Sequence, residues 1–317
     1  MEERKIPIII DCDPGHDDAI ALIMAFAARN LKVLGVTTTS GNQTLEKTTR
    51  NALRVLSYIG KQPLVAKGCT APLIRPLEVA PSVHGNSGLD GPVIPEAAFS
   101  AQEESAWELS RRLIQESPEP VTMVCTGPLT NLAILLKAYP KVKQGIRQVC
   151  LMGGGINHGN WTVAAEFNIL VDPEAASIVF SSGIPIIMCG LDVTEKAILR
   201  VEDIEAIRNL GGRVPVFVAD LLDFFLRFHM SMGFSGAPLH DPTTIAYLMR
   251  PELFVTENLY VQVETQGKYT TGMTFADKRV NPHRPEPNAT VCMGIDREGF
   301  VRLLKECCLS YGSGVLV

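Results

Sequence analysis

The residues best suited to chemistry lie near the amino terminus, where four aspartates occur within eight positions. Asp11, Asp13, Asp17 and Asp18 surround a Pro-Gly pair in the segment Asp11-Cys12-Asp13-Pro14-Gly15-His16-Asp17-Asp18. Carboxylates this close repel one another unless a cation or bound protons lie among them. A hard divalent cation accepts such oxygen ligands, whereas zinc would favour Cys or His. We therefore predict a metal site in this segment.

The elements around these aspartates must hold them in place. The apolar run before them predicts a buried strand that ends at Asp11, and Ala19–Ala28 predicts a buried helix after the Pro-Gly turn. The acids therefore lie at the carboxyl end of a strand, where open α/β sheets bind ligands. A plain turn is the alternative, but four acids flanked by apolar residues are costly without a partner.

Strand-like and helix-like segments alternate through the first two-thirds of the chain. This order predicts an α/β fold with an open, mostly parallel sheet flanked by helices, and a single domain over residues 1–317. Three later segments predict a small β patch, and Arg297–Ser310 predicts a closing helix. The predicted strands of the main sheet are Ile6–Asp11, Lys32–Thr38, Pro63–Ala66, Val121–Cys125, Arg147–Met152 and Pro185–Cys189. The intervening predicted helices are Asp18–Asn30, Leu45–Ile59, Ala101–Gln115, Leu129–Ala138 and Pro173–Ser181, followed by Val214–His229. The predicted late strands are Tyr260–Val263, Thr270–Phe275 and Ala289–Ile295.

Composition excludes several classes of partner. The 317 residues are 46% hydrophobic and 20% charged, with a net charge of −5 and no basic block, so nucleic acid and anionic membranes are not expected partners. The longest apolar stretch, Ala19–Ala28, is too short to span a bilayer, and the amino terminus lacks the apolar core of a secretory signal. The eight cysteines have no C-x-x-C spacing, which favours buried thiols in a cytoplasmic protein.

Polar residues follow several of the predicted strands. Asn42 follows the second, Thr126 follows Val121–Cys125, and Gly153-Gly154-Gly155 follows Arg147–Met152. The carboxyl ends of parallel strands meet at one edge of a sheet, so these residues would gather with the aspartates. The three glycines would either cradle a phosphate or allow close backbone packing, because no complete phosphate-binding motif is present.

Two further groups suggest ligand recognition. Asn160, Glu166 and Asn168 lie in a polar loop before Asp172-Pro173, which is typical of a helix start, and with Asn42 they resemble hydroxyl-binding groups of a sugar site. His240 precedes Asp241 in a loop, and His84 lies in the long segment Gly68–Pro95, so both are candidate acid–base groups. Asp241 alone would be a helix N-cap.

Together, several motifs in this order resemble the calcium-dependent nucleoside hydrolases. They are Asp11-Cys12-Asp13-Pro14-Gly15-His16-Asp17-Asp18-Ala19, Gly41-Asn42-Gln43-Thr44, Leu151-Met152-Gly153-Gly154-Gly155, Ala165-Glu166-Phe167-Asn168 and His240-Asp241-Pro242. The resemblance covers nearly the whole chain. Val83-His84-Gly85, Leu89-Asp90-Gly91-Pro92 and Val263-Glu264-Thr265-Gln266-Gly267-Lys268-Tyr269 are similar to the bacterial pyrimidine-specific branch of that family.

The resemblance implies hydrolysis of the N-glycosidic bond of uridine and cytidine to ribose and free base, with a role for each motif. It implies Ca²⁺ held by Asp13, Asp18, Asp241 and the carbonyl of Thr126, with Asp13 activating the attacking water that the ion binds. The transition state would be oxocarbenium-like. The resemblance also implies substrate contacts from Asp17 and Asn42 to the 2′-hydroxyl, Asn168 to the 3′-hydroxyl and Asn160 with Glu166 to the 5′-hydroxyl, with His240 and His84 facing the base. Relatives of this kind are commonly homotetramers, so self-association as a tetramer or dimer is expected.

Three other functions are compatible with parts of the pattern. A broader purine and pyrimidine nucleoside hydrolase is the nearest, although the helix with Phe224, Phe225 and Phe228 lacks the tyrosines that stack on purines in relatives. An aspartate-dependent phosphohydrolase also begins with an apolar strand and Asp-x-Asp, but no later Asp-Asp pair follows. A nucleoside binder without catalysis would keep the same ligand-binding residues.

Overall fold

Eight strands form the central sheet, in the order β3-β2-β1-β4-β5-β6-β12-β9. Neighbouring strands run parallel except for β9, which is antiparallel to β12. The computed structural model describes residues 5–279, 283 and 285–317. The strands are β1 Ile6–Cys12, β2 Leu31–Thr38, β3 Val65–Lys67, β4 Val121–Cys125, β5 Ile146–Met152, β6 Ile186–Cys189, β7 Ile198–Leu199, β8 Ala237–Pro238, β9 Phe254–Leu259, β10 Val261–Val263, β11 Thr274–Ala276 and β12 Ala289–Ile295. The helices are α1 His16–Ala27, α2 Leu45–Tyr58, α3 Pro81–His84, α4 Ala106–Glu116, α5 Thr130–Ala138, α6 Phe167–Val171, α7 Pro173–Phe180, α8 Leu191–Thr194, α9 Val201–Arg208, α10 Arg213–Ser231, α11 Pro242–Met249 and α12 Arg297–Ser313, with 3₁₀ turns at Pro140–Gly145 and Pro251–Leu253.

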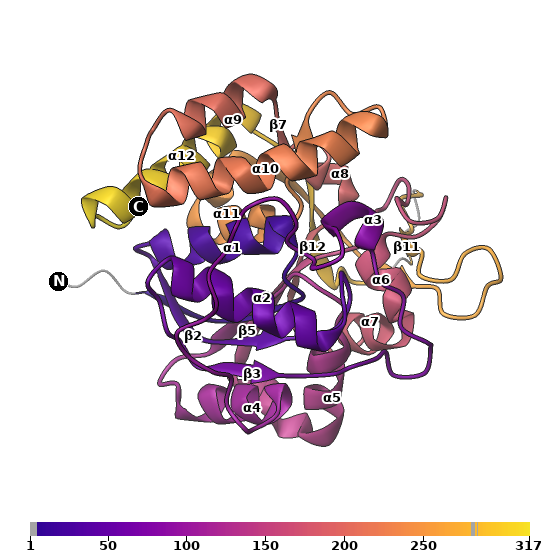
Figure 1. Ribbon diagram of the computed structural model, residues 1–317. Coiled ribbons are helices and arrows are strands. Elements are labelled where there is room, and N and C mark those ends of the chain that lie inside the picture. Colours follow the sequence, from indigo (N-terminus) through magenta and orange to yellow (C-terminus); the bar gives the residue numbers. More distant parts are fainter. Residues whose placement is uncertain (1–4, 280–282, 284) are drawn as a thin grey trace.

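Helices cover both faces of this sheet (Figure 1). Side chains alternate between the faces along each strand, so Ile8 and Ile10 pack with α1, α10, α11 and α12, whereas Ile9 packs with α4, α5 and α7. All three isoleucines are at most 1% exposed. The near-continuous apolar run before Asp11 is therefore what a parallel strand buried on both faces requires, and the predicted α/β fold is confirmed.

The late β segments differ from the prediction. Ala289–Ile295 is not part of a separate patch, because it pairs with β6 and extends the central sheet. An edge strand that the sequence did not indicate, Phe254–Leu259, pairs with it, and only β10 and β11 form a separate antiparallel pair. The residues from Val255 to Asn258 are exposed, so this strand has no apolar run. The predicted helix Ala101–Gln115 begins five residues later, at Ala106, after a Ser105 N-cap.

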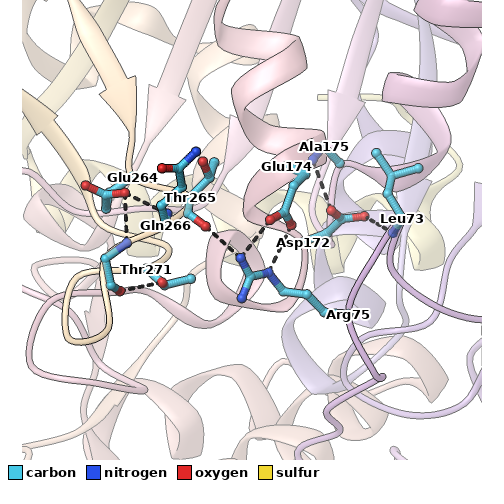
Figure 2. Close-up of polar contacts among 10 residues, drawn as sticks. Leu73, Arg75, Asp172, Glu174, Ala175, Glu264, Thr265, Gln266 and Thr271 are labelled. Atoms are coloured by element: carbon cyan, nitrogen blue, oxygen red, sulfur yellow. Dashed lines mark hydrogen bonds and ion pairs between the residues drawn. The ribbon is translucent and has the colours of Figure 1, made fainter.

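The long segment before α4 is anchored near its beginning by Arg75. The Arg75 guanidinium donates to both carboxylate oxygens of Glu174 at 3.0 and 2.7 Å, and also to the Thr265 carbonyl at 2.7 Å (Figure 2). The Asp172 carboxylate accepts from the Leu73 amide at 2.9 Å and caps α7 through the Ala175 amide at 3.0 Å, as predicted for that helix start. The segment therefore joins α7 and the β10–β11 connection before it reaches His84.

In the part of the chain that the structure describes, no helix has the length and apolar character needed to cross a membrane. All eight cysteines are free and buried.

Candidate active site

Asp13, Asp17 and Asp18 lie where β1 passes into α1. The backbone amides of Asp13 and Gly15 donate to the Asp18 carboxylate at 3.3 and 2.9 Å, which closes the turn on the side chain of the first helical turn. The unpaired amides at a helix start favour carboxylates there. Asp11 lies further back and accepts from Thr37 Oγ1 at 2.6 Å, so it supports the turn.

Asp241 joins this group from the other end of the chain. Carboxylate oxygens of Asp17, Asp18 and Asp241 all lie within 4.8 Å of one another, and all three residues are buried. Asp241 precedes α11, yet among the described residues no amide of that helix bonds to its side chain. Asp241 therefore occupies the N-cap position of α11, as the simpler explanation predicted, but its carboxylate does not cap the helix and instead contacts Asp18.

Asp13 lies beside the group of three rather than within it. Its Oδ2 accepts from the Asn42 amide at 2.6 Å, while Oδ1 is buried and has no hydrogen-bond partner among the described residues. Two glycines enclose the carboxylate, since a Cβ at Gly41 would lie 2.1 Å from Oδ2 and one at Gly127 would lie 2.5 Å from Oδ1. A buried, unpaired carboxylate oxygen is costly without a proton or cation to share it.

Burial raises the pKa of every carboxyl of this cluster, and repulsion by neighbouring carboxylates adds to it at Asp13, Asp17 and Asp241. Burial first, and then the Asp18 carboxylate, raise the pKa of Asp17 to about 7, and the same causes raise the pKa of Asp13 well above its usual value. Burial, followed by repulsion from Asp17 and Asp18, likewise raises the pKa of Asp241. A cation would relieve this repulsion, and oxygen-only donors suit Ca²⁺ or Mg²⁺. The residues present therefore fit a hard divalent metal.

The predicted sugar-binding residues line one cavity together with Asp241, and the volume of this cavity is about 380 Å³. Asn168 donates from Nδ2 to the Thr126 carbonyl at 2.8 Å. The residue predicted to bind the 3′-hydroxyl is therefore hydrogen-bonded to the carbonyl predicted to bind the ion. Asn42 donates from Nδ2 to Asp18 at 3.2 Å. Asn168 and Asn42 each keep the amide oxygen for a ligand.

Glu166 and Asn160 lie at one wall of this cavity. The Glu166 carboxylate accepts from the Gly154, Asn168 and Ile169 amides at 2.8, 3.0 and 3.1 Å, and burial raises its pKa. Asn160 Oδ1 accepts from the Phe167 amide at 3.0 Å, which leaves Nδ2 as a donor. The Gly154 amide donates to the Glu166 carboxylate, and the Gly155 amide donates to Thr274 Oγ1 at 2.8 Å. Because both amides already have partners, these two glycines allow close packing and do not cradle a phosphate.

Histidines and aromatic rings also line this cavity. His240 is held by a contact of 2.8 Å between its Nδ1 and Thr194 Oγ1, and burial, with a smaller effect of His229, lowers its pKa to about 3. His84 also lines the cavity and is 5% exposed. The sequence did not single out His229, which also lines this cavity. The sequence named Phe225 and Phe228 only in the argument about base specificity, and it did not predict that Met152, Trp161, Phe167, Met232 and Phe234 line the cavity.

The pattern of Phe225, Phe228 and His229 fits both a cavity wall and a buried core helix. Phe225, Phe228 and His229 follow one another at helical spacing on α10, which is equally typical of a helix buried in a core. Their place in the cavity depends on the packing of α10 against α3 and α1, which no local pattern specifies.

Comparison with known proteins agrees with this geometry. The pattern of the family described as "Inosine-uridine preferring nucleoside hydrolase" matches residues 8–302. A relative from Citrobacter koseri, "Pyrimidine-specific ribonucleoside hydrolase RihA", is 54% identical over 97% of this chain and 99% of its own length. The structure is similar to "Purine-Preferring Ribonucleoside Hydrolase from Gardnerella vaginalis", with a TM-score of 0.90 and 32% identity over 96% of this chain and 98% of that one.

The family match covers most of the chain, and the relatives are aligned over nearly their whole length. This family match leaves no support for the alternative function of an aspartate-dependent phosphohydrolase. The chain belongs to the inosine-uridine preferring nucleoside hydrolase family and is an N-glycosidase.

Proposed function

We propose that this enzyme hydrolyses the N-glycosidic bond of pyrimidine ribonucleosides, uridine and cytidine, to ribose and free base. The observation that carries the proposal is a single cavity lined by Asp17 and Asp241 together with His84 and His240. The two carboxylates suit a diol and a cation, and the two histidines suit a heterocyclic base. The 54% identity to a relative named pyrimidine-specific supports the choice of base.

The chain's own residues account for binding of the ribose. Asn42 and Asn168 have committed their amide hydrogens to protein oxygens, so their Oδ1 atoms accept from the 2′- and 3′-hydroxyls. Asp17 accepts a second hydrogen bond from the 2′-hydroxyl. Asn160 donates to the 5′-oxygen, and Glu166 accepts its proton. Together these contacts fix C1′ relative to the acidic cluster.

Asp13 is the residue that takes the proton from the attacking water. Its Oδ2 is held by the Asn42 amide, whereas Oδ1 is unpaired among the residues that the structure describes, so Oδ1 is the basic atom. Asp13, Asp18, Asp241 and the Thr126 carbonyl would hold Ca²⁺, which when bound supplies a template for the diol and the water. The carboxylates also stabilise the positive charge that develops on the ribose as the bond to the base lengthens.

The departing base needs a proton or a hydrogen bond. His240 turns Nδ1 to Thr194, which leaves Nε2 for the base, and His84 lines the same cavity. Because its lowered pKa keeps His240 neutral at pH 7, its contribution is a hydrogen bond from Nε2–H to the departing base, with Nδ1 accepting from the Thr194 hydroxyl.

Release of base and ribose from a nucleoside panel tests this proposal. We expect uridine and cytidine to be cleaved well and inosine and adenosine slowly, with activity lost on chelation and restored by added Ca²⁺. No release from any nucleoside, with binding retained, would favour the non-catalytic binder. Full activity after complete metal removal would contradict the metal's role.

Cleavage of purines is a second candidate. The structural relative from Gardnerella vaginalis is named purine-preferring and shares the fold at a TM-score of 0.90. Comparable kcat/KM for inosine and uridine in the same panel would establish the broader specificity.

We further propose that residues 1–317 form one domain, since the core clusters on both faces share one sheet. Self-association into a tetramer or dimer, testable by sedimentation, and a cytoplasmic location stay predictions.

A further inference from the structure

His84 reaches the cavity from the end of α3, a helix of only four residues that Gly85 follows with φ 78°. The His84 and Gly85 amides donate to the Ala80 and Pro81 carbonyls, but these backbone bonds do not set the rotation of the imidazole ring. The ring is nearly fully buried and stacks against Phe225, with ring centroids 5.7 Å apart. Some other group must therefore fix the direction of its two nitrogens.

The group in contact with His84 is His16, the first residue of α1. The backbone amide of His16 donates to His84 Nδ1 at 3.3 Å, so this nitrogen accepts and Nε2 of the neutral His84 ring carries the proton. The His16 Nδ1 atom packs against the same nitrogen at 3.3 Å. Nε2 is therefore the nitrogen of His84 that can donate to a ligand in the cavity.

His16 is itself fixed from its far side. Its Nε2 lies 2.8 Å from the Asp90 carbonyl oxygen, which can only accept, so Nε2 donates. Phe224 stacks flat on the His16 ring, with 4.8 Å between centroids and 1° between planes. These two contacts fix the orientation of the His16 ring, with Nε2 facing Asp90 and Nδ1 facing His84.

Asp90 in turn closes the loop that carries His84. Its carboxylate accepts from the Asn86 amide at 2.9 Å and the Ser87 amide at 3.1 Å, and also from the Ser87 hydroxyl. A Cβ at Gly85 would lie 2.2 Å from that carboxylate, so the turn needs glycine there. One residue thus shapes the loop with its side chain and holds His16 with its backbone.

We propose that His16 and Asp90 are positioning residues that fix the His84 imidazole with Nε2 directed at the leaving base. This inference rests on the proposed function, because it assigns a task within that site. Neither residue needs to contact the substrate. Their effect would be confined to departure of the base, because the proposed ribose contacts come from other side chains, namely Asp17, Asn42, Asn160, Glu166 and Asn168.

The test compares two leaving groups. Uracil leaving uridine requires a proton or a hydrogen bond, whereas 4-nitrophenolate leaving 4-nitrophenyl β-ribofuranoside is stable without one. We expect His16→Leu to lower kcat for uridine about 10-fold or more, with KM changed less than about 3-fold. The same variant should cleave the nitrophenyl riboside within about 2-fold of wild type.

Further variants separate positioning from structure. His16→Gln keeps a side-chain N–H for the Asp90 carbonyl, so it should recover part of the uridine rate. The double variant His16→Leu/His84→Ala should be no slower than His84→Ala alone, since both act through one imidazole. Asp90→Asn, which places an N–H against the loop amides, should share the His16→Leu profile. Asp296→Asn is the matched control, because Asp296 also accepts a backbone amide, Gly299, but at α12.

Several results would overturn the inference. Equal losses on both substrates would make His16 a merely structural residue, as would a His16→Gln variant no better than His16→Leu. Additive losses in the double variant would show that His16 acts independently of His84. A wild-type enzyme that cleaves no nucleoside would instead overturn the proposed function. Thermal unfolding of each variant confirms that the folded enzyme is compared.

Discussion

At the scale of single residues, the site works because most of its polar atoms are already committed. Amide hydrogens of Asn42 and Asn168 bond to protein oxygens, and the Glu166 carboxylate accepts three backbone amides. In the proposed function, Asn42 and Asn168 therefore offer the substrate their amide oxygens. Such preorganisation means that no reorientation is needed when charge develops.

Asp13 gives the sharpest prediction at this scale. Asp13→Asn replaces the unpaired basic oxygen with an amide of nearly the same shape, so we expect kcat to fall by roughly 10²–10⁴-fold. Binding of uridine should remain measurable, because the ribose contacts come from other residues. Single-turnover kinetics and calorimetric titration measure the two effects separately. Unchanged turnover would remove Asp13 from its role as base.

Asn160 tests recognition of the 5′-hydroxyl. Its Oδ1 is held by the Phe167 amide, so Nδ2 is the group that contacts the substrate. Loss of one neutral hydrogen bond in Asn160→Ala should lower kcat/KM for uridine about 2- to 10-fold. With 5′-deoxyuridine, which lacks the hydroxyl, the variant and the wild type should be equal. A similar loss on both substrates would mean that Asn160 only shapes its loop.

At the scale of elements, sequence reasoning succeeded wherever one segment supplied the signal. The isoleucines before Asp11 and the Pro-Gly turn predicted β1, the turn and α1, because strand burial and turn chemistry are local. The edge strand Phe254–Leu259 was missed, because its side chains are mostly exposed and only backbone pairing to β12 defines it.

Contacts between distant segments could not be predicted from the sequence, because no local pattern specifies them. His16 and His84 are 68 positions apart, and nothing in either motif indicates that their rings meet. The meeting of Asp18 with Asp241 was expected only through the family resemblance. Of the candidate site, the residue types could thus be predicted, while the bond that orients each atom could not.

The anchoring of the long segment before α4 gives a prediction at this scale. Arg75 makes a bidentate pair with Glu174 and also holds the Thr265 carbonyl, and its side chain is 34% exposed (Figure 2). We expect Arg75→Ala to lower global stability by less than about 1 kcal/mol, because partly exposed pairs contribute little. Amide exchange of residues 73–91 should nevertheless become faster, since the segment loses its link to α7.

Hydrogen exchange read by mass spectrometry checks this expectation. Arg112→Ala is the matched control, because Arg112 lies on α4 and its ion pairs among the described residues are with Glu104 and Glu116, outside residues 73–91. Faster exchange in both variants, or in neither, would show that Arg75 does not anchor the segment.

At the scale of the whole molecule, the fold brings carboxylates from distant parts of the sequence together at one site. Asp13, Asp17 and Asp18 follow the first strand, whereas Asp241 lies more than 200 residues later in the sequence. Folding therefore brings buried carboxylates together against their own repulsion. A bound cation that relieves this repulsion must stabilise the folded chain as well as serve the reaction.

This coupling predicts a stability effect that is independent of turnover. When free Ca²⁺ exceeds its Kd about 100-fold, binding to the folded state alone adds about 2.7 kcal/mol. For a chain of 317 residues that corresponds to a rise in Tm of roughly 4 °C over chelator-treated protein. Asp241→Asn should abolish most of the rise, because it removes one of the three clustered carboxylates. Asp296→Asn, far from the cluster at the start of α12, should retain it. Scanning calorimetry with and without chelator measures the difference, and an equal Ca²⁺ response in the two variants would place the ion elsewhere.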